Sequence, residues 1–384
     1  MKTYILFHLN LFFSSVEIKD RKKIINNCYE PLLELSKSLD FKIGVEASGL
    51  TIEEIQKLSP KFLGKLKKSL IDNQIEFIGS GYSQSIGPLI PYEVNLKNFE
   101  LGKKVYREIL DIDPKIALVN EMTFSKSIPD ILIESGYESM IMDVNNLLHK
   151  DFPKKDITNQ FLSINNKKFN ILWSDFNLFQ KFQQLIYQDI SFEEYKNVLQ
   201  KKLKAGPFPI YSNDAEIFDF RPGRFSAERP IAGNSEWKII HQNLKKIQQL
   251  ENVEILDPSM LIKVPKKNHR INIDNIINSP IHIPVKKQPK YNFSRWSVTG
   301  INDPWINSIC YKILKKIKKL PKNTQQQYWK KVCYFWSSDF RTHLTKNRWK
   351  NLERDIRKTK KDLKIKENNY QKMKIRFQNK SNYK

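Results

Sequence analysis

The chain has 384 residues, of which 40% are hydrophobic and 12% aromatic, a composition that supplies a folded core and excludes global disorder. Its net charge is +25, but residues 311–384 alone contain 24 Lys and Arg against 5 Asp and Glu. The charge therefore predicts no specific nucleic-acid binding by the body of the chain. The basic C-terminal segment either contacts an anionic surface (RNA, a membrane surface or an acidic glycan) or is a solvated helical face.

Cysteine usage and hydropathy indicate the cellular compartment of the protein. Cys28, Cys310 and Cys333 are far apart and lack metal-ligand spacing, which fits a reducing compartment. The apolar run at the N-terminus resembles a signal peptide, but His8 and Asn10 interrupt it. No stretch reaches the roughly 18 apolar residues that a membrane span needs. We predict a cytoplasmic protein without a transmembrane segment.

Short apolar runs alternate with longer amphipathic stretches from residue 3 to about residue 256. Strands are expected at 3–9, 41–46, 75–80, 115–120, 139–144, 169–174, 208–213 and 253–258. Helices are expected at 18–39, 60–73, 94–110, 191–204 and 236–250. Strand–helix alternation of this kind predicts parallel pairing, in either an α/β barrel or a doubly wound sheet.

The pattern changes after residue 258. Residues 259–292 are rich in proline and irregular, and we interpret them as a linker. Residues 293–384 then follow as a basic α-helical domain, with helices expected at 305–320, 323–340 and 347–378. The predicted organisation is a barrel domain over 1–258, the linker, and this helical domain.

Polar side chains follow nearly every expected strand. In parallel barrels the loops at the carboxyl ends of the strands build the active site. The residues at or near these exits are His8, Asn10, Glu46, Glu76, Glu121, Asp143, Asp175 and Asp214. With aromatic residues expected beside them (Phe124, Trp173, Tyr211 and Phe218), such a site suits a polyhydroxylated ligand. Strand ends are polar in many proteins, so salt bridges at the rim of the barrel are the alternative.

Four short motifs, in order, resemble those of glycoside hydrolase family 57. They are FHLNLFF with His8, NQIE with Glu76, VNE with Glu121 and SNDAEIF with Asp214. RWSVTG, which contains Trp296, is the best match to the fifth motif. The resemblance implies an α/β fold, a (β/α)7-type barrel followed by a C-terminal helical domain, and activity on α-glucans.

The resemblance also implies roles for two carboxylates. Glu121 would be the nucleophile, and Asp214 the general acid/base, of a retaining hydrolase or transglycosylase acting on an α-linked glycan. The other polar residues named above would contact an oligo- or polysaccharide, and Trp296 would flank the sugar. Glu216, Arg221 and Arg224 would either brace the loop after Asp214 or contact substrate. The arginines would suit an anionic group on the substrate.

Other readings stay open. Leu9-Asn10 stands where the family has Gln-Pro, which motivates a non-catalytic glycan-binding or assembly protein on the same barrel. We predict no metal and no cofactor, because the six histidines form no HxxxH or HExxH pair and no phosphate-binding loop is present. Four residues of the stretch FWSSDFRTHLTKNRW either face the barrel mouth or pack between helices: Trp336, Asp339, Arg341 and His343.

Overall fold

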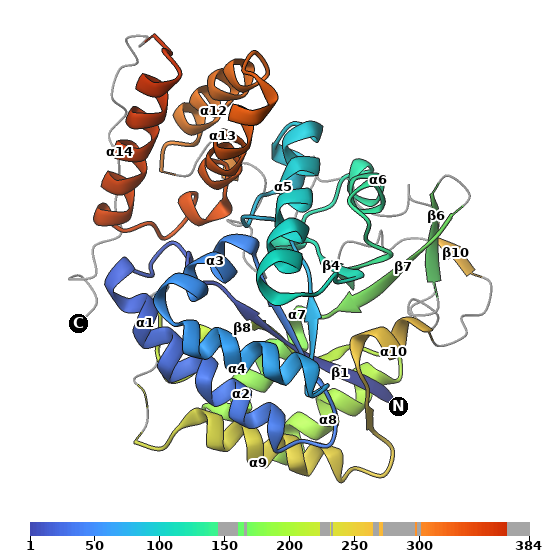
Figure 1. Cartoon of the computed structure of the whole chain (residues 1–384). Helices are drawn as coiled ribbons and strands as arrows, with labels where there is room; N and C mark the ends of the chain where they lie inside the picture. The colour runs from blue at the N-terminus through green and yellow to red at the C-terminus, as the bar shows by residue number, and fades with distance from the viewer. Residues whose placement is uncertain are drawn as a thin grey trace.

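The computed structural model describes residues 1–144, 160–164, 167–222, 231, 233–263, 269–271, 296–297 and 301–366. Seven parallel strands form its centre, in the spatial order β8-β1-β2-β3-β4-β5-β7 (Figure 1). Their bounds are β1 Lys2–Leu9, β2 Ile43–Ala47, β3 Ile75–Ile78, β4 Ile116–Leu118, β5 Ser139–Asp143, β7 Lys167–Ser174 and β8 Pro209–Asp214. Each lies within two residues of a strand expected from the sequence.

The seven strands form a distorted barrel. Gly79, just after β3, joins the two halves: its N–H donates to Ile116 O at 2.9 Å, and its carbonyl accepts from Leu118 N at 2.8 Å. Within the described residues no ladder connects β7 to β8. Instead, the Tyr4 hydroxyl of β1 donates to Trp173 O of β7 at 3.1 Å. The barrel is therefore least regular between β7 and β8.

Three further short strands extend this frame. β6 (Gln160–Ile164) runs antiparallel to β7, and β10 (His269–Ile271) pairs with β6. Neither was expected from the sequence. β9 (Glu254–Ile255) pairs with the start of β1, and the helix α10 (Pro258–Lys263) follows it, so the strand expected at 253–258 is much shorter than predicted.

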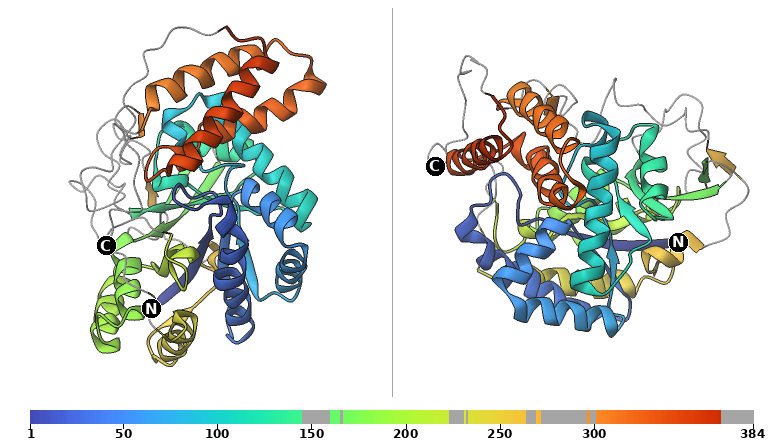
Figure 2. Two further views of the ribbon diagram at one scale, coloured as in Figure 1. Left: turned by 90° about the vertical axis from the view of Figure 1, so that its left-hand side faces the viewer. Right: turned by 45° about the horizontal axis from the view of Figure 1, so that its top comes forward.

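Helices cover the outside of the barrel, as the two views in Figure 2 show. Their bounds are α1 Arg21–Ile24, α2 Glu30–Lys37, α3 Gly49–Leu58, α4 Pro60–Ile71, α5 Tyr92–Val105, α6 Ser127–Glu134, α7 Phe176–Ile186, α8 Phe192–Leu203 and α9 Glu236–Gln248. The helices expected at 18–39 and 94–110 are interrupted or extended by π-helical turns at Ile25–Tyr29 and Tyr106–Leu110.

The alternation of side chains along β1 determines what points into the barrel. Ile5 and Phe7 pack outward in the main core, beneath the helices. Tyr4 and Leu6 belong to a smaller apolar cluster that gathers side chains from β1, β3, β4, β5, β7 and α10, which meet only inside the barrel. Since successive side chains of a strand point to opposite faces, His8 continues the inward series at the carboxyl end.

Three helices follow the barrel and dock on its carboxyl end. They are α12 (Asp303–Ile317), α13 (Lys322–Phe335) and α14 (Lys346–Asp362). Ser338 N donates to Gln84 O at 2.7 Å, and the buried guanidinium of Arg348 donates to Phe12 O at 2.7 Å. The predicted fold class, a barrel followed by C-terminal helices, is confirmed. The division at 258 and 292 stays a prediction, because 272–295 lie outside the described residues.

The basic run at the end of the chain is partly a packed helix. In α14 the side chains of Trp349, Leu352 and Ile356 are buried against the rest of the protein, while most of its basic residues are exposed. Residues 367–384 lie outside the described part of the chain. Contact of this segment with an anionic surface therefore remains a prediction.

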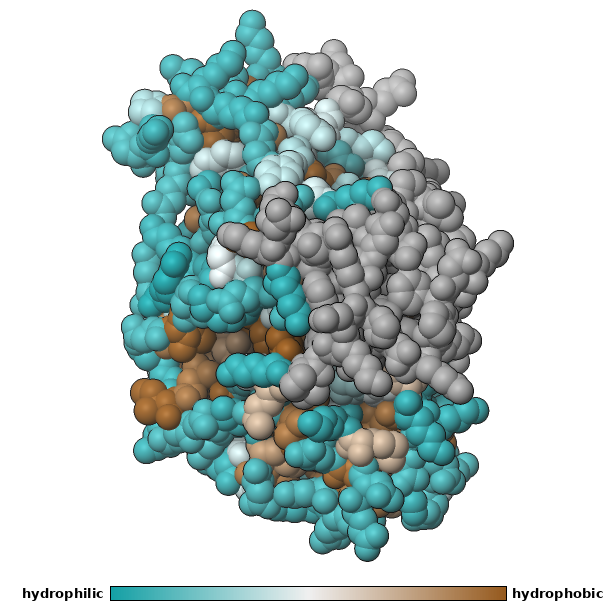
Figure 3. Space-filling model, turned by 90° about the vertical axis from the view of Figure 1, so that its right-hand side faces the viewer, coloured by the Kyte–Doolittle hydropathy of each residue, from teal (hydrophilic) through white to brown (hydrophobic). Residues whose placement is uncertain are grey.

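The surface is predominantly hydrophilic on the face shown in Figure 3, with apolar residues in separated patches. The large apolar side chains that are exposed include Ile71 and Met260. Across the described ranges, every helix is too short or too polar to traverse a lipid bilayer.

Candidate active site

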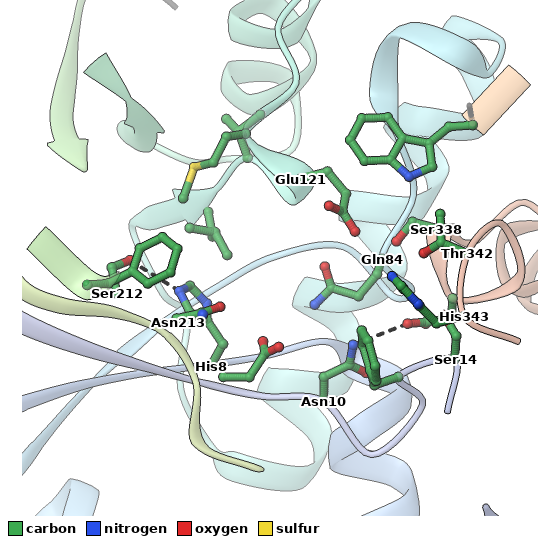
Figure 4. Close-up of a pocket in the computed structure, with 18 residues that line it drawn as sticks. His8, Asn10, Ser14, Gln84, Glu121, Ser212, Asn213, Ser338, Thr342 and His343 are labelled. Atoms are coloured by element: carbon green, nitrogen blue, oxygen red, sulfur yellow. Dashed lines mark hydrogen bonds between the residues drawn. The ribbon is translucent and has the colours of Figure 1, made fainter. Parts of the chain in front are cut away.

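A pocket of about 140 Å³ opens where the carboxyl ends of β1, β4 and β8 meet the segment after α13 (Figure 4). Its described lining is mostly polar or acidic. It comprises His8, Asn10, Phe13, Ser14, Gln84, Leu118, Val119, Glu121, Met122, Phe179, Ser212, Asn213, Asp214, Trp296, Ser338, Asp339, Thr342 and His343. Five of the residues predicted to be catalytic or to bind substrate are among them: His8, Asn10, Glu121, Asp214 and Trp296. Of the four residues for which the sequence left two interpretations, Asp339 and His343 line the pocket, whereas Trp336 and Arg341 are buried against α12.

His8 is held in place from both sides. Its Nδ1 lies 3.0 Å from Oε2 of Glu46 on β2, and its Nε2 lies 3.2 Å from Oγ of Ser212 on β8. Glu46 is fully buried and is not part of the pocket lining. Glu46 therefore orients the His8 ring from below, because a carboxylate favours a proton on the nitrogen that faces it.

Glu121 follows β4 on a sharply turned backbone. Glu121 and Met122 both have φ of 53°, and Glu121 has ψ of 15°, the left-handed region that side-chain-bearing residues rarely adopt. Such residues cost about 1–3 kcal/mol each and are kept where the surrounding structure over-determines them. The turn directs the Glu121 carboxylate into the pocket, as Figure 4 shows.

Asp214 is the last residue of β8 and pairs in register with His8 of β1. The hydroxyl of Tyr211 donates to the backbone carbonyl of Asp214 at 2.9 Å, which fixes the end of the strand. β8 and β4 are separated by three strands in the order of the barrel, so Asp214 and Glu121 enter the pocket from different sides.

Glu216 lies beneath the pocket and is almost completely buried. Its Oε1 accepts from Asn10 N at 2.5 Å and from the Tyr29 hydroxyl, whereas its Oε2 has no hydrogen-bond partner among the described residues. Burial, followed by the nearby Asp214 charge, raises the pKa of Glu216 to about 7. Glu216 therefore changes charge near neutral pH directly below the candidate acid/base.

The raised pKa of Glu216 predicts a dependence of stability on pH. Between the ordinary pKa of a glutamate and about 7, the folded protein holds a proton that the unfolded chain has lost. The free energy of unfolding should therefore fall as pH rises through this window. In Glu216→Gln, whose amide oxygen can accept the same two hydrogen bonds, the fall should be smaller. Urea titrations at pH 5 to 8 measure both slopes, and parallel slopes would contradict this assignment.

Asn10 connects the first strand to the segment after α13. Its side-chain Nδ2 donates to Oδ1 of Asp339 at 3.2 Å, and Asp339 Oδ2 accepts from the Ser337 hydroxyl at 2.7 Å. Burial raises the pKa of Asp339 to about 6, and the Glu121 charge contributes in the same direction. A third carboxyl group thus lies close to the two that the sequence selected.

Three predicted acids lie elsewhere. Glu76 points to the opposite end of the barrel, where it accepts from Ser259 N at 3.0 Å at the start of α10. Asp143 accepts from Phe176 N at 3.0 Å. Asp175 caps the same helix, α7, and lies 2.5 Å from Lys202 Nζ. These acids hold helix ends, and the structure does not bring them to the pocket.

The expected arginine contacts are also structural where they are described. Both terminal nitrogens of Arg221 donate to the buried Glu236, and its guanidinium lies 4.6 Å from the centre of the Tyr187 ring. Arg221 thus braces the loop after β8. Arg224 lies outside the described residues.

The aromatic residues expected beside the acids are not in the lining. Phe124, Trp173, Tyr211 and Phe218 are buried in the main core. The aromatic residues that line the pocket are Phe13, Phe179 and Trp296. No group of three or more His, Cys, Asp or Glu side chains is arranged to hold a metal ion in the part of the chain that is described.

Several lining residues were not selected from the sequence, chiefly Gln84, Ser212, Asn213 and Thr342. Gln84 lies on the loop after β3. α5 packs directly on this loop. The two approach so closely that a Cβ at Gly102 would lie 2.6 Å from Ser80 O. The glycine-rich stretch at 79–87 was the available signal for a loop in close contact with its neighbours.

Comparisons with known proteins agree with this architecture. A model of glycosyl hydrolase family 57 matches residues 3–203, just over half of the chain. The 4-alpha-glucanotransferase of Thermococcus litoralis is 25% identical over 133 residues, which are 34% of this chain and 20% of that protein. The relatives matched by sequence are aligned over about a fifth to a quarter of their own length.

Solved structures extend the likeness over nearly the whole chain. The crystal structure of the same Thermococcus litoralis enzyme has a TM-score of 0.70 at 15% identity, covering 94% of this chain and 60% of that one. The alpha-amylase AmyC of Thermotoga maritima has a TM-score of 0.64 at 12% identity, covering 94% and 92%. At these identities the structures establish the fold alone. Together with the family model, they confirm the resemblance seen in the sequence: the chain belongs to glycosyl hydrolase family 57.

Proposed function

We propose that this protein is a retaining glycoside hydrolase or transglycosylase that acts on an α-linked glucan. The observation that carries the proposal is the convergence of Glu121 and Asp214, 93 positions apart in the chain, on one pocket. Two carboxyl groups on either side of a glycosidic bond are the minimum that double displacement requires. The relatives matched by sequence are alpha-amylases and a 4-alpha-glucanotransferase, which supports an α-glucan as substrate.

In this proposal Glu121 attacks the anomeric carbon as Asp214 gives its proton to the leaving glycosidic oxygen. The bond from the anomeric carbon to that oxygen breaks, and an ester to Glu121 forms. Asp214, now a carboxylate, then removes a proton from water or from an acceptor hydroxyl, which attacks the same carbon and releases Glu121. Water gives hydrolysis, and a sugar hydroxyl gives transfer.

The rest of the pocket suits a neutral sugar. His8, Asn10, Gln84 and Asp339 offer hydrogen-bonding groups for hydroxyls, and Trp296 offers an apolar ring face. The described lining contains no Lys or Arg, and Arg221 is engaged with Glu236. An anionic group on the substrate, expected from the two arginines, thus has no described residue to support it.

Intact-mass spectrometry after exposure to activated α-glycosyl fluorides tests the proposal. Fluoride leaves without a proton, so the wild type and Asp214→Asn should gain one glycosyl unit and Glu121→Gln should gain none. Glu251→Gln, at an exposed position, is the matched control and should behave as the wild type. An adduct that persists in Glu121→Gln would sink the assignment of the nucleophile.

The alternative is a glycan-binding or assembly protein without turnover. It would be favoured if no donor labels the wild type while an α-glucan still binds to the pocket. Isothermal titration with maltooligosaccharides measures this binding, and Asn10→Ala and Trp296→Ala should weaken it if the pocket is the binding site. Binding without any labelling would favour the alternative.

A further inference from the structure

A second hollow lies outside the candidate active site, between α5, the end of α6 and the start of α13. We call it the α5–α13 groove. It measures about 800 Å³ and is lined by Lys97, Glu100, Leu101, Lys103, Lys104, Arg107, Glu134, Ser135, Gly136, Lys322, Gln325, Gln326 and Trp329. α5 and α13 lie side by side in Figure 1, and none of these residues lines the pocket around Glu121.

Five of the lining residues are cationic and two are acidic, and both acids have partners. Glu100 lies 2.5 Å from Lys97 Nζ, and Glu134 accepts from the Tyr92 hydroxyl at 2.8 Å. The other three cations that matter here, Lys104, Arg107 and Lys322, are not neutralised by a close carboxylate. Lys104 and Arg107 form only long contacts with exposed carboxylates, at 3.6 and 3.8 Å.

Lys322 is exposed and stands in the first turn of α13, on the wall opposite Lys104. It has no ion-pair or hydrogen-bond partner within the described ranges. The free N–H groups of a helix start add positive potential at this point. Cations and a helix dipole therefore face the groove from both walls.

The floor of the groove is also electrically positive. Asp113 is shared by three cations: Lys103 at 3.1 Å, Lys115 at 3.5 Å and Arg107 at 3.8 Å. Lys103 is buried and also donates to Gly136 O at 2.7 Å. Burial lowers the pKa of Lys103, and Lys115 and Arg107 act in the same direction. Lys115 also lies 3.3 Å from Glu138, so two carboxylates face three cations. One positive charge is left over, and an anion bound here would be stabilised.

One wall of the groove is aromatic. Trp329 is half-buried, and its indole N–H donates to Oε1 of Gln325 at 3.4 Å. The Gln325 and Gln326 amides lie beside this ring on the same face of α13. Tyr92, which is 45% exposed, stands at the Glu134 side. The groove thus combines cations with ring surface and amide groups.

We propose that the α5–α13 groove binds an organic phosphate of sugar-phosphate size. The phosphate would lie among Lys104, Arg107 and Lys322, and the ring of the ligand would lie against Trp329. Cations select the phosphate. The Gln326 amide can donate to ligand hydroxyls or accept from them, and the carboxylates Glu100 and Glu134 can accept from them. The proposal is independent of the reaction assigned to Glu121 and Asp214.

The experiment is isothermal titration of the full chain with glucose 6-phosphate, inorganic phosphate and maltotriose. We expect glucose 6-phosphate to bind and inorganic phosphate to bind more weakly. Any heat from maltotriose should be the same in the groove variants described below as in the wild type, because it would come from the pocket around Glu121. Lys104→Glu with Lys322→Glu should weaken binding of both phosphates by at least about tenfold, as expected for two charge-assisted contacts. Lys61→Glu, an exposed charge reversal on α4, is the matched control and should change neither.

Trp329→Phe distinguishes the two parts of the ligand. It should weaken glucose 6-phosphate and leave inorganic phosphate unchanged, and circular dichroism verifies that the variant is folded. The proposal would be overturned if glucose 6-phosphate fails to bind the wild type, or binds the double variant as tightly. Equal affinity of the groove for maltotriose would overturn it too, since a neutral glycan would then be the ligand.

Discussion

Replacing Asp214 with asparagine is expected to lower kcat on an unactivated α-glucan by about 10²–10⁴-fold, the usual contribution of general acid–base catalysis. The loss should depend on the leaving group. A glycosidic oxygen needs a proton as its bond breaks, whereas fluoride does not. Steady-state kinetics with a maltooligosaccharide, and burst kinetics with an α-glycosyl fluoride, measure the two cases. The first should be strongly impaired, while the glycosylation burst should remain close to that of the wild type.

Asp72→Asn is the matched control, because Asp72 is exposed at the end of α4 and far from the pocket in the fold. It should not change either rate. Equal losses of Asp214→Asn with both donors would contradict the role of proton donor. They would indicate instead that Asp214 mainly binds or orients the sugar.

The second large effect concerns stability. Arg341 and Asp303 form an ion pair at 3.3 Å with both side chains buried, and Arg341 also donates to Oδ1 of Asn307 at 3.0 Å. Asp303→Ala would leave the guanidinium buried without its carboxylate. Breaking such a pair from one side costs about 3–5 kcal/mol, because the remaining charge is not compensated. Urea unfolding should register a loss of this size.

Two further variants make the stability prediction specific. Asp362→Ala removes a partly exposed carboxylate 3.8 Å from Lys331 and should cost less than about 1 kcal/mol. The double variant Asp303→Leu with Arg341→Met should recover much of the loss, because apolar side chains of similar size need no partner. A double variant as unstable as Asp303→Ala would show that packing, rather than the unpaired charge, sets the cost.

Much of the barrel could be predicted from side-chain periodicity. The position of His8 at the end of a strand and the order of the short motifs selected His8, Glu121 and Asp214, which do share a pocket. The alternation of side chains along a strand does not show at which end of the barrel a given side chain lies. Glu76 also lies on an inward-facing strand position, but it is at the far end and caps α10.

Other differences arise because the N–H groups at a helix start bind acids that were expected to face the active site from the strand ends. Asp143 and Asp175 follow strands, as expected, yet the exposed N–H groups at the start of α7 take both. Asp339 shows the opposite case. Its hydrogen bond to Asn10 spans 329 positions, and only the docking of the C-terminal helices brings the two together. No short sequence pattern shows that these two residues are in contact.

This long-range contact has a consequence for synthesis on the ribosome. Chains grow at about 5–20 residues per second and their domains fold from the N-terminus. The stretch from Asp214 to His343 therefore takes on the order of ten seconds to make. During that time a nascent barrel can carry both candidate catalytic carboxylates in an open cleft. The wall that contains Asp339 is made last, so the candidate active site becomes complete only once the C-terminal helices have emerged and docked.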